Sequence, residues 1–269
     1  MFLKEKKKRI NLMKEKLDIT ASIVLYNEDL KELTKAVNCF LDSSLKKKLF
    51  LIDNTPNKKF KGIFKQKEVA YIGVGKNIGF GAAHNIIIDK IKNSSKFHLI
   101  LNPDVSFKKD VLPNLINQLE IDTTIAMIAP KILFPNNTHQ YSCRRYPSPV
   151  ELLARRFAFL NPIFKATIFN GTYRDKNLEK PLYAAYITGC FHLYKTPDFV
   201  ALQGFDERYF LYMEDVDICK KIDVLGKKKL YYPKEEVMHV LKQGSSKNIH
   251  LFFRHTSSAI KYFLKWGVN

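Results

Sequence analysis

Short apolar runs alternate with segments of helical periodicity through the first half of this chain. The runs, each typical of a buried strand, lie at residues 21–26, 49–52, 69–72, 97–101 and 125–129. Strands that alternate with helices predict an α/β fold, with a mostly parallel central sheet flanked by helices. Ligands bind such sheets outside the carboxyl ends of the strands. Asp53 and Asp104 follow the second and fourth runs, so we expect them to converge at one edge of the sheet.

The bulk composition indicates one large domain and an acidic partner. The chain has 269 residues, of which 46% are hydrophobic, so a sizeable core can be buried. Its formal net charge is +19, which favours nucleic acid, an anionic membrane face or a phosphorylated ligand as the partner. We expect a basic tail at 1–17, a main domain at 18–240 and a helical, basic-aromatic extension at 241–269. For the tail, a solvated segment and contact with a membrane surface are both open.

The spacing of the cysteines and the hydropathy of the chain indicate the cellular compartment of the protein. The four cysteines have no C-x-x-C spacing, so we expect reduced, mostly buried thiols of a cytoplasmic protein rather than a zinc knuckle. No apolar run approaches the roughly 20 residues that span a bilayer, and no apolar region follows the basic N-terminus as in a secretory signal. We therefore expect a cytoplasmic protein, with peripheral attachment to the inner face of the cell membrane as an open option.

From residue 130 to about 182 the alternating pattern breaks down. Prolines interrupt it, and arginines stand among phenylalanines between residues 144 and 164. We expect an insertion into the main domain rather than a separate domain. The Arg- and Phe-rich part suits a phospholipid surface, and equally a helical subdomain that covers the sheet. Further on, we predict a helix at 217–225 and two short strands at 229–232 and 237–240.

The segment at 205–217 concentrates acidic side chains among aromatic ones. Like charges so close together are costly unless something binds them, so the segment predicts a functional site. Its last part, at 214–217, stands at the start of the predicted helix. A carboxylate of this cluster is a candidate for taking a proton, while Asp104 is a candidate for holding a cation.

Several single positions allow a functional and an ordinary interpretation. Hard cations take oxygen ligands and leave positions open for phosphate, so Asp104, one more protein ligand and a diphosphate suit Mg²⁺ or Mn²⁺. His239, in a short apolar strand, is either a satisfied core residue or that second ligand. Asp53 either binds a nucleotide or begins an Asx-turn. The glycine-rich turn at 73–81 lacks the dinucleotide and P-loop patterns but allows close backbone approach to a ligand.

Taken together, these motifs resemble the inverting family 2 glycosyltransferases of the GT-A fold, especially their rhamnosyltransferase-like branch. The motifs that carry the resemblance lie at residues 22–27, 52–54, 77–85, 101–104, 188–190 and 205–217, and at His239. Their order and spacing make the match specific over about residues 19–239. The resemblance implies a GT-A catalytic domain that binds a nucleotide sugar, with the segment at 130–182 on the acceptor side.

The resemblance also implies which residues bind the donor. Asn27 and Asp53 would contact the nucleoside. The donor pocket would be shaped by Asn77, Gly79 and Asn85.

The metal and the base follow from the same resemblance. Asp104 would be the metal-binding acid of a DXD-type motif, and His239 a further ligand. At the position of the first acid of that motif this chain has Asn102, which we expect to bind the donor. We therefore expect either a lower metal affinity or a metal that is held mainly by the donor diphosphate. Asp215 would be the general base, with Glu214 beside it.

The implied reaction moves a sugar, with inversion, from a nucleotide-sugar donor to a hydroxyl of a cell-surface polysaccharide or a lipid-linked oligosaccharide precursor. L-rhamnose from a dTDP donor is the best match, and another nucleotide sugar is the alternative.

The charge of +19 also suggests nucleic-acid binding as a competing function, but no helix-turn-helix, RNP or zinc signature is present and the acidic cluster would repel phosphate. A nucleotidyltransferase, which also needs metal and carboxylates, stays open.

Overall fold

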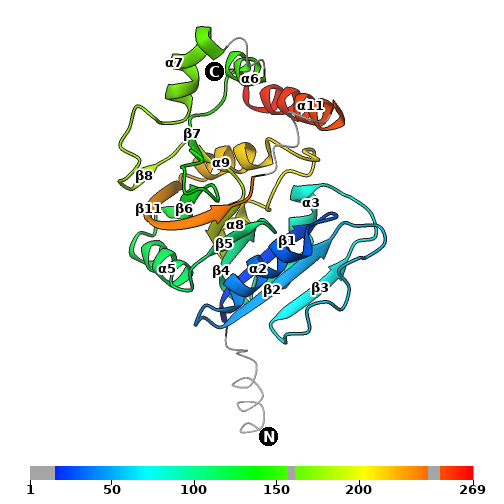
Figure 1. The fold of residues 1–269 in the computed structure, drawn as a ribbon. Coiled ribbons are helices and arrows are strands. Elements are labelled where there is room, and N and C mark those ends of the chain that lie inside the picture. The colour runs from blue at the N-terminus through cyan, green and yellow to red at the C-terminus, as the bar shows by residue number, and fades with distance from the viewer. Residues whose placement is uncertain (1–15, 157–160, 242–248, 269) are drawn as a thin grey trace, which may run out of the picture.

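The computed structural model describes residues 16–156, 161–241 and 249–268. Its centre is a nine-stranded sheet with helices on both faces (Figure 1). The strands follow the order β3-β2-β1-β4-β10-β6-β11-β5, and β8 pairs with β11 beside this path. The α/β fold expected from the sequence is confirmed. Of the basic tail expected at 1–17, residues 1–15 lie outside the described residues.

The N-terminal part of the chain forms the parallel half of the sheet. It contains β1 (Leu17–Leu25), β2 (Lys47–Asp53), β3 (Val69–Gly73) and β4 (Ser95–Leu101). β2 and β4 pair with the two sides of β1, and β3 pairs with β2. In this register Leu25, Asp53 and Gly73 stand side by side, so three strands end together at one edge of the sheet.

The other half of the sheet is mixed. β6 (Ile125–Leu133) and β11 (Lys228–His239) are parallel neighbours, while β10 (Phe191–Lys195) runs antiparallel between β4 and β6. β5 and β8 pair antiparallel with β11, and β7 pairs with β9 in a separate two-stranded sheet. These four short strands are β5 (Val105–Phe107), β7 (Cys143–Arg144), β8 (Leu182–Tyr183) and β9 (Tyr186–Ile187).

Apolar side chains alternate along the strands and build one core on each face of the sheet. In β2, Leu49 and Leu51 enter one core and Phe50 and Ile52 the other, because successive residues of a strand point to opposite faces. Residues of α2 (Leu30–Leu41) and α5 (Val111–Ile121) complete the first core. The helices of the second core are α3 (Phe80–Asn85), α4 (Ile88–Ile91), α8 (Thr196–Ala201) and α9 (Glu214–Val224).

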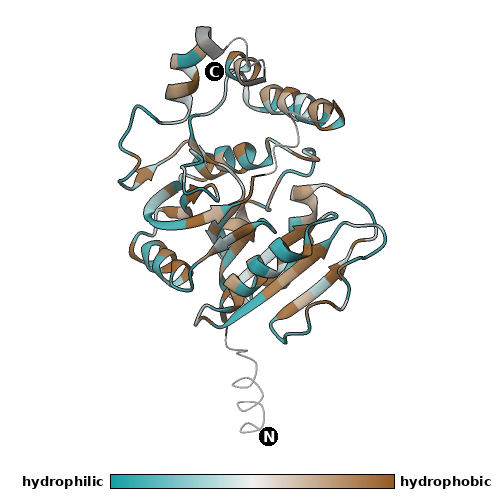
Figure 2. Ribbon diagram, in the orientation of Figure 1, coloured by the Kyte–Doolittle hydropathy of each residue, from teal (hydrophilic) through white to brown (hydrophobic). Residues whose placement is uncertain are grey.

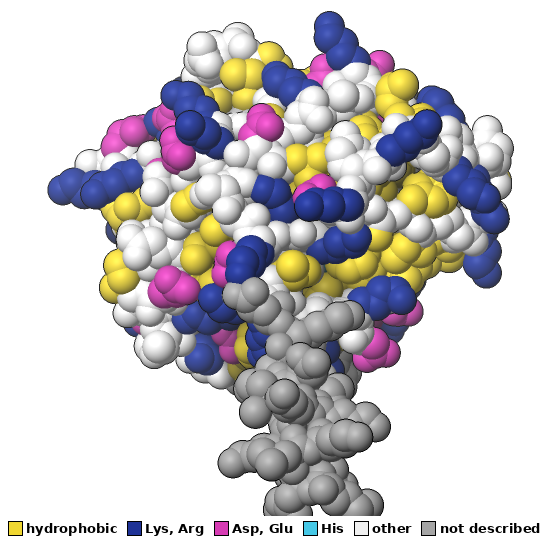
Figure 3. Space-filling view, turned by 90° about the horizontal axis from the view of Figure 1, so that it is seen from below, with side chains coloured by type: hydrophobic (Ala, Val, Ile, Leu, Met, Phe, Trp, Pro, Cys, Tyr) yellow, Lys and Arg dark blue, Asp and Glu magenta, His cyan; other side chains and the backbone are white. Residues whose placement is uncertain are grey.

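Three further helices gather at one end of the molecule. They are α6 (Pro149–Arg156), α7 (Asn161–Gly171) and α11 (Ile249–Trp266), and they lie opposite the end at which β1 begins (Figure 1). Hydrophilic and hydrophobic residues alternate along α11 (Figure 2). At the opposite end, Lys and Arg side chains are scattered over the whole face of the molecule (Figure 3), in keeping with the charge of +19.

Two local predictions were wrong in their boundaries. The strands predicted at 229–232 and 237–240 are one strand, β11, whose register on β6 shifts between Tyr232 and Glu236. The shift takes up Pro233, which has no N–H for the ladder. The helix predicted at 217–225 begins earlier, at Glu214, so both candidate catalytic acids lie in the first turn of α9. Acidic side chains are favourable there because the helix dipole is positive at its N-terminus.

Candidate active site

Asp104 and His239 meet where β4 and β11 end. The chain leaves β4, turns at residues 102–104 and enters β5, and β5 pairs with β11 so that Val105 lies opposite His239. The Oδ1 atom of Asp104 therefore lies 3.3 Å from Nε2 of His239. Both residues are buried. The sequence prediction that these two residues belong to one site is consistent with this geometry.

Gln140 fixes the ring of His239 from the other side. Its Oε1 atom accepts a hydrogen bond from Nδ1 of His239 at 3.0 Å, and its Nε2 donates to the backbone carbonyl of His239 at 2.6 Å. Because a carboxamide oxygen only accepts, Nδ1 carries the proton and Nε2 is turned toward Asp104. Burial opposes a positive charge on the ring, but Cys190 and Asp104 outweigh it and raise the pKa of His239 to about 10.

The pair of Asp104 and His239 would fit a divalent cation once His239 gives up the proton that its raised pKa keeps on Nε2, because a metal-bound imidazole is neutral. Within the described ranges, no group of three His, Cys, Asp or Glu side chains surrounds a common point. One carboxylate and one imidazole leave most coordination positions of Mg²⁺ or Mn²⁺ free for water and phosphate oxygens. The donor set thus suits a cation held jointly by the protein and a diphosphate, and does not suit a closed structural metal site.

Glu214 and Asp215 follow a strained turn at the start of α9. Tyr212 and Met213 both adopt positive φ, at 69° and 67°. Such a conformation costs a non-glycine residue about 1–3 kcal/mol and is commonly found at functional sites. Burial, and then the charge of Asp215, raise the pKa of Glu214 to about 8. Among the described residues, nothing donates a hydrogen bond to Oε2 of Glu214.

Asp215 is held by two backbone amides. Its Oδ1 atom accepts from its neighbour Val216 at 2.9 Å, and its Oδ2 accepts from Gly189 at 3.2 Å. Burial raises the pKa of Asp215, and these two hydrogen bonds act in the opposite direction. The side chain is therefore oriented by the backbone while its proton affinity is increased by its surroundings.

Gly189 and Cys190 connect Asp215 to the turn that carries Asp104. The amide of Gly189 binds Asp215, and the carbonyl of Cys190 accepts the amide of Asn102 at 2.9 Å. A Cβ atom on Gly189 would lie 3.1 Å from Cβ of Asp215, so the glycine permits this close approach. The candidate base and the candidate metal-binding turn thus belong to one contiguous site.

Other residues predicted for the donor cluster at the ends of β1, β2 and β3. The Oδ1 atom of Asp53 accepts from the amide of Thr55 at 2.9 Å, which is an Asx-turn, and Oδ2 accepts from Tyr71 at 2.7 Å. The backbone amide of Asn27 donates to the hydroxyl of Thr55 at 3.2 Å. Asp53 therefore begins the Asx-turn that the sequence raised, and this turn ties Asn27 to Asp53; contact of Asp53 with a nucleotide stays a prediction.

The next loop brings Asn77 and Gly79 to the same edge. Oδ1 of Asn77 accepts the amide of Gly79 at 3.0 Å, and the carbonyl of Gly79 accepts from Asn54 at 3.0 Å. Asn54 belongs to the motif at 52–54, but no role in the site was predicted for it from the sequence. Gly79 has φ of 95°, and a Cβ atom there would lie 2.5 Å from the carbonyl oxygen of Phe210. Only glycine fits this contact between the donor-side loop and the acidic segment.

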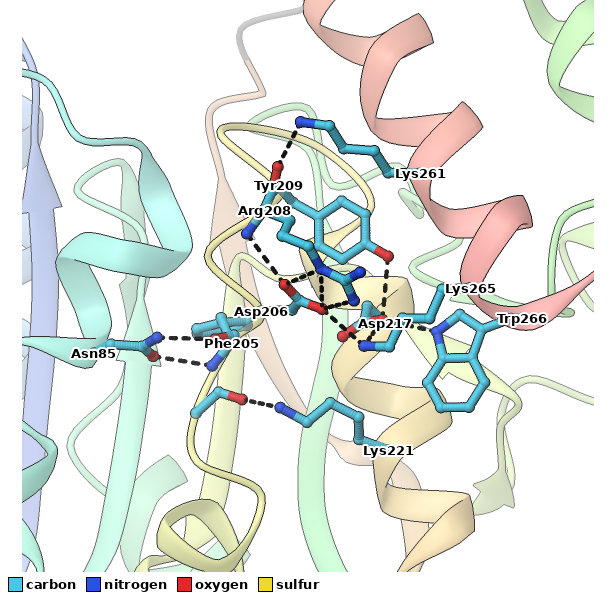
Figure 4. A network of polar contacts seen from close by, with 11 residues as sticks. Asn85, Phe205, Asp206, Arg208, Tyr209, Asp217, Lys221, Lys261, Lys265 and Trp266 are labelled. Atoms are coloured by element: carbon cyan, nitrogen blue, oxygen red, sulfur yellow. Dashed lines mark hydrogen bonds and ion pairs between the residues drawn. The ribbon is translucent and has the colours of Figure 1, made fainter.

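Asn85 clamps the acidic segment by its side chain. Its Oδ1 accepts the amide of Phe205 at 2.9 Å, and its Nδ2 donates to the carbonyl of Phe205 at 2.8 Å (Figure 4). The same Nδ2 also donates to Glu207 at 3.0 Å. These partners occupy both ends of the carboxamide. Asn85 therefore connects α3 to the segment that leads to Glu214.

The far side of the acidic segment is held by α11. Lys265 Nζ lies 2.8 Å from Asp206 and 2.7 Å from Asp217, and the indole of Trp266 donates to Asp217 at 2.7 Å (Figure 4). Hydrogen bonds from Arg208 and Lys265 hold the pKa of Asp206 well below its usual range. Apart from the basic and aromatic composition of the C-terminal segment, no feature of the sequence predicted this contact.

A cavity of about 630 Å³ opens on the segment at 130–182. Its charged and aromatic lining includes Lys131, His139, Tyr141, Arg174, Glu179 and Glu236. The guanidinium of Arg174 lies 4.0 Å from the centre of the Tyr141 ring, and Lys131 is paired with Glu179 and Glu236. The candidate metal ligands and the candidate base do not line this cavity. Its link to them is His139, which precedes Gln140, the residue that orients His239.

The mixed, mostly parallel sheet with helices on both faces is the GT-A fold of glycosyltransferases. Two solved structures share the fold. GalNAc-T7 with UDP, GalNAc and Mn²⁺ has a TM-score of 0.64 and 18% identity, over 86% of this chain and 45% of that one. The mannosyltransferase PcManGT from Pyrobaculum calidifontis, in complex with GDP-Man and Mn²⁺, has a TM-score of 0.58 and 14% identity, over 98% of this chain and 70% of that one.

The family model described as Glycosyl transferase family 2 matches residues 20–200, and the chain belongs to this family. Rhamnosyltransferase WbbL of Escherichia coli (strain K12) is 27% identical over 199 residues, 70% of each chain. The N-acetylglucosaminyl-diphospho-decaprenol L-rhamnosyltransferase of Mycobacterium tuberculosis is 26% identical over 222 residues, 77% of this chain and 70% of that one. The chain is thus a glycosyltransferase of the rhamnosyltransferase-like branch, as its motifs predicted.

Proposed function

We propose that this glycosyltransferase takes a sugar from a nucleotide-sugar donor and transfers it with inversion, with dTDP-L-rhamnose as the best candidate donor. The acceptor is a hydroxyl of a cell-surface polysaccharide or of a lipid-linked glycan precursor. The names of two relatives support this choice, since both are rhamnosyltransferases and one name includes a diphospho-decaprenol carrier. Another nucleotide sugar is the alternative donor. Attachment to the inner face of the membrane, where a lipid-linked acceptor would lie, is part of the proposal.

The general base in this proposal is Asp215. The observation that carries it is the hydrogen bond from Gly189 to Asp215, continued through Cys190 to Asn102, which joins a half-buried carboxylate to the turn of Asp104. Burial raises the pKa of Asp215, and a base with a higher pKa accepts a hydroxyl proton more readily. Proton removal by a positioned carboxylate accelerates such a reaction by about 10²–10⁴-fold. A single displacement needs no covalent nucleophile.

Glu214 has a different role beside the base. With its pKa raised to about 8, it keeps its proton at neutral pH and adds no second negative charge next to Asp215. Protonated Glu214 thereby leaves Asp215 as the ionised member of the pair. This division of roles matches other sites in which environment separates two neighbouring carboxyl groups.

Asp104 and His239 are the proposed protein ligands of Mg²⁺ or Mn²⁺. When bound, the cation would act as a Lewis acid that stabilises the departing diphosphate. Two solved structures of the same fold contain Mn²⁺ together with a nucleotide or a nucleotide sugar, which supports a metal in this site. Gln140 would keep Nε2 of His239 directed at the ion.

The donor and the acceptor would approach from different sides. Asn27, Asp53, Asn77 and Gly79 are proposed to line the nucleotide side, where their loops meet at the sheet edge. Asn102 would face the donor diphosphate, and Asn85 would shape the pocket by holding the acidic segment. The cavity on the segment at 130–182 is the proposed acceptor side, because aromatic rings with charged side chains around them suit a sugar.

A panel of nucleotide sugars, each with Mg²⁺ or Mn²⁺, tests the proposal. Thermal shift reports donor binding, and release of nucleoside diphosphate reports transfer. We expect one donor, dTDP-L-rhamnose, to give the largest shift and metal-dependent release. Release of pyrophosphate would instead indicate nucleotidyl transfer, and full activity in EDTA would remove Asp104 and His239 from their proposed role.

A further inference from the structure

The outer side of α11 carries an apolar stripe that the fold leaves exposed. Four large side chains are exposed on this helix: Ile249 (58%), Phe253 (61%), Ile260 (55%) and Leu264 (82%). Their spacings of four, seven and four residues keep them within roughly 60° of one another around a helix of 3.6 residues per turn. The four side chains therefore lie along one face of the helix, as two pairs separated by Thr256 and Ser257.

The opposite side of α11 already has its partners. Ser258 and Tyr262 are buried, and the Ser258 hydroxyl donates to the carbonyl of Leu211 at 2.9 Å. Lys265 and Trp266 bind Asp217 (Figure 4). The packing of α11 on the catalytic domain thus uses one side of the helix, and the apolar stripe on the other side contributes nothing to that packing.

The surroundings of the stripe are positive. None of the residues of α11 or α7 is acidic, while α11 contains Arg254 and Lys261 beside the stripe; its third basic residue, Lys265, is paired with Asp206 and Asp217. The acidic residue of α6, Glu151, is buried. Further exposed apolar side chains lie at this same end of the molecule (Figure 1), on α6 and α7: Val150, Leu153 and Phe169.

We propose that α11 lies along an anionic lipid surface, with its apolar stripe at the boundary between headgroups and acyl chains. Apolar residues on one side and basic residues beside them are the features of helices that lie in the membrane interface. Within the described ranges, no helix is long and apolar enough to cross a membrane. A second copy of the chain fits this face poorly, because two such faces would bring like charges together without any acidic residue on α11 or α7 to pair with them.

Lipid binding at α11 would bear on the catalytic segment directly. The flank of the helix contacts residues 206–213 at two points, since Lys261 donates to the carbonyl of Arg208 at 2.8 Å and the guanidinium of Arg254 lies 3.7 Å from the centre of the Phe210 ring. This segment ends at Glu214. A membrane that holds the outer side of α11 would therefore stabilise the segment that presents the two carboxyl groups.

Vesicle co-sedimentation of the full chain tests the inference. It rests on the proposed action at a lipid surface, but it is measured without donor or acceptor, so its failure would leave glycosyl transfer unaffected. Vesicles of phosphatidylcholine are compared with vesicles of phosphatidylcholine and phosphatidylglycerol in equal parts. The test variant is Phe253→Ser with Leu264→Ser. The matched control is Ile121→Ser with Val224→Ser, which removes two equally exposed apolar side chains (70% and 75%) from other helices.

We expect the wild type and the control to bind the anionic vesicles, and the α11 variant to bind at least about tenfold more weakly, because two apolar side chains no longer enter the interface. Unchanged thermal melting of the α11 variant would show that the loss is not unfolding. Equal binding by all three proteins would overturn the inference and assign lipid binding to another part, such as residues 1–17. No binding by the wild type, together with a dimer in ultracentrifugation that the α11 variant loses, would instead make the stripe a self-association surface.

Discussion

The carboxylate of Asp215 accepts a hydrogen bond from the amide of Gly189 at 3.2 Å. Gly189 leaves little room for a side chain at this contact, since an added Cβ would lie 3.1 Å from Cβ of Asp215. The orientation of the proposed base therefore depends on the backbone between β9 and β10. Gln140 and Lys265 likewise hold parts of the site without taking part in the proposed reaction.

Gly189→Ala should displace Asp215 and slow catalysis. The new methyl group must push the Asp215 side chain aside by a few tenths of an ångström. Small displacements of a reacting group cost up to about 10²-fold in rate, so we expect kcat to fall by about 10–100-fold with donor affinity unchanged. Steady-state kinetics and calorimetric titration of the donor measure the two quantities. A wild-type kcat would mean that the Gly189 contact does not set the position of the base.

Gln140→Ala should weaken metal binding. Without the carboxamide, neither the tautomer nor the ring orientation of His239 is fixed. Loss of such a partner of a metal ligand typically lowers metal affinity by about 10–100-fold. Titration of Mn²⁺ followed by electron paramagnetic resonance measures this directly, without turnover. Gln140→Glu, which keeps an acceptor for Nδ1, is the control and should retain more of the affinity. Equal affinity in all three proteins would show that His239 needs no such support.

Three buried histidines should make the fold sensitive to acid. Burial lowers the pKa of His98 to about 3, that of His192 to about 4 and that of His84 well below 6.5. In the unfolded chain these groups take up protons below about pH 6.5, whereas in the folded chain they remain neutral. Each histidine therefore removes up to about 1.4 kcal/mol of stability per pH unit as the pH falls from 6.5 toward its folded pKa.

Urea unfolding between pH 7.5 and pH 5 measures this dependence. His98→Asn should show a shallower loss of stability on acidification than the wild type, even where its stability at neutral pH is lower. The hydroxyl of Ser22 bridges His84 and His98 at 2.7 and 3.0 Å, so the variant also tests that polar network. Glu214, whose pKa is raised to about 8, adds stability on acidification and opposes the histidines in both proteins. The same pH dependence in His98→Asn as in the wild type would mean that water reaches His98 in the folded state.

Lys265→Met should destabilise the protein and lower its activity. Asp217 is fully buried, and removing Lys265 takes away the only cation bonded to it in the part of the chain that the structure describes. An uncompensated buried charge costs about 3–5 kcal/mol. Lys261→Met is the matched control, because Lys261 donates only to a backbone carbonyl. Thermal melting and kcat are measured for both variants. Equal effects of the two substitutions would show that the ion pair between Lys265 and Asp217 is not what α11 contributes to stability and activity.

The parts of the site that follow a strand directly could be predicted from the sequence. Asp53 and Asp104 stand at strand ends, and the register of parallel strands brings such positions to one edge. The roles of Gln140 and of α11 could not be predicted, because they depend on contacts between distant segments: Gln140 and His239 are 99 residues apart, and Lys265 and Asp206 are 59 apart. Hydrophobic periodicity has no signal for such polar contacts.

Asn85 illustrates the same limit within a motif. Its place in the motif at 77–85 predicted a position at the donor pocket, while its side chain is bonded to residues about 120 positions further along the chain. Because the carboxamide of Asn85 has both its donors and its acceptor bound to other protein groups, Asn85 supports the position of the acidic segment. Whether it also borders the bound donor stays a prediction of the resemblance.

The most direct test is a comparison of the wild type with Asp215→Asn, using dTDP-L-rhamnose, the glycan acceptor and Mn²⁺. We predict that the variant binds the donor with wild-type affinity, because the carboxamide oxygen that replaces the carboxylate can still accept the amide of Gly189. Its rate of transfer should fall by about 10²–10⁴-fold for want of a base. Transfer at the wild-type rate by Asp215→Asn would contradict the proposed mechanism.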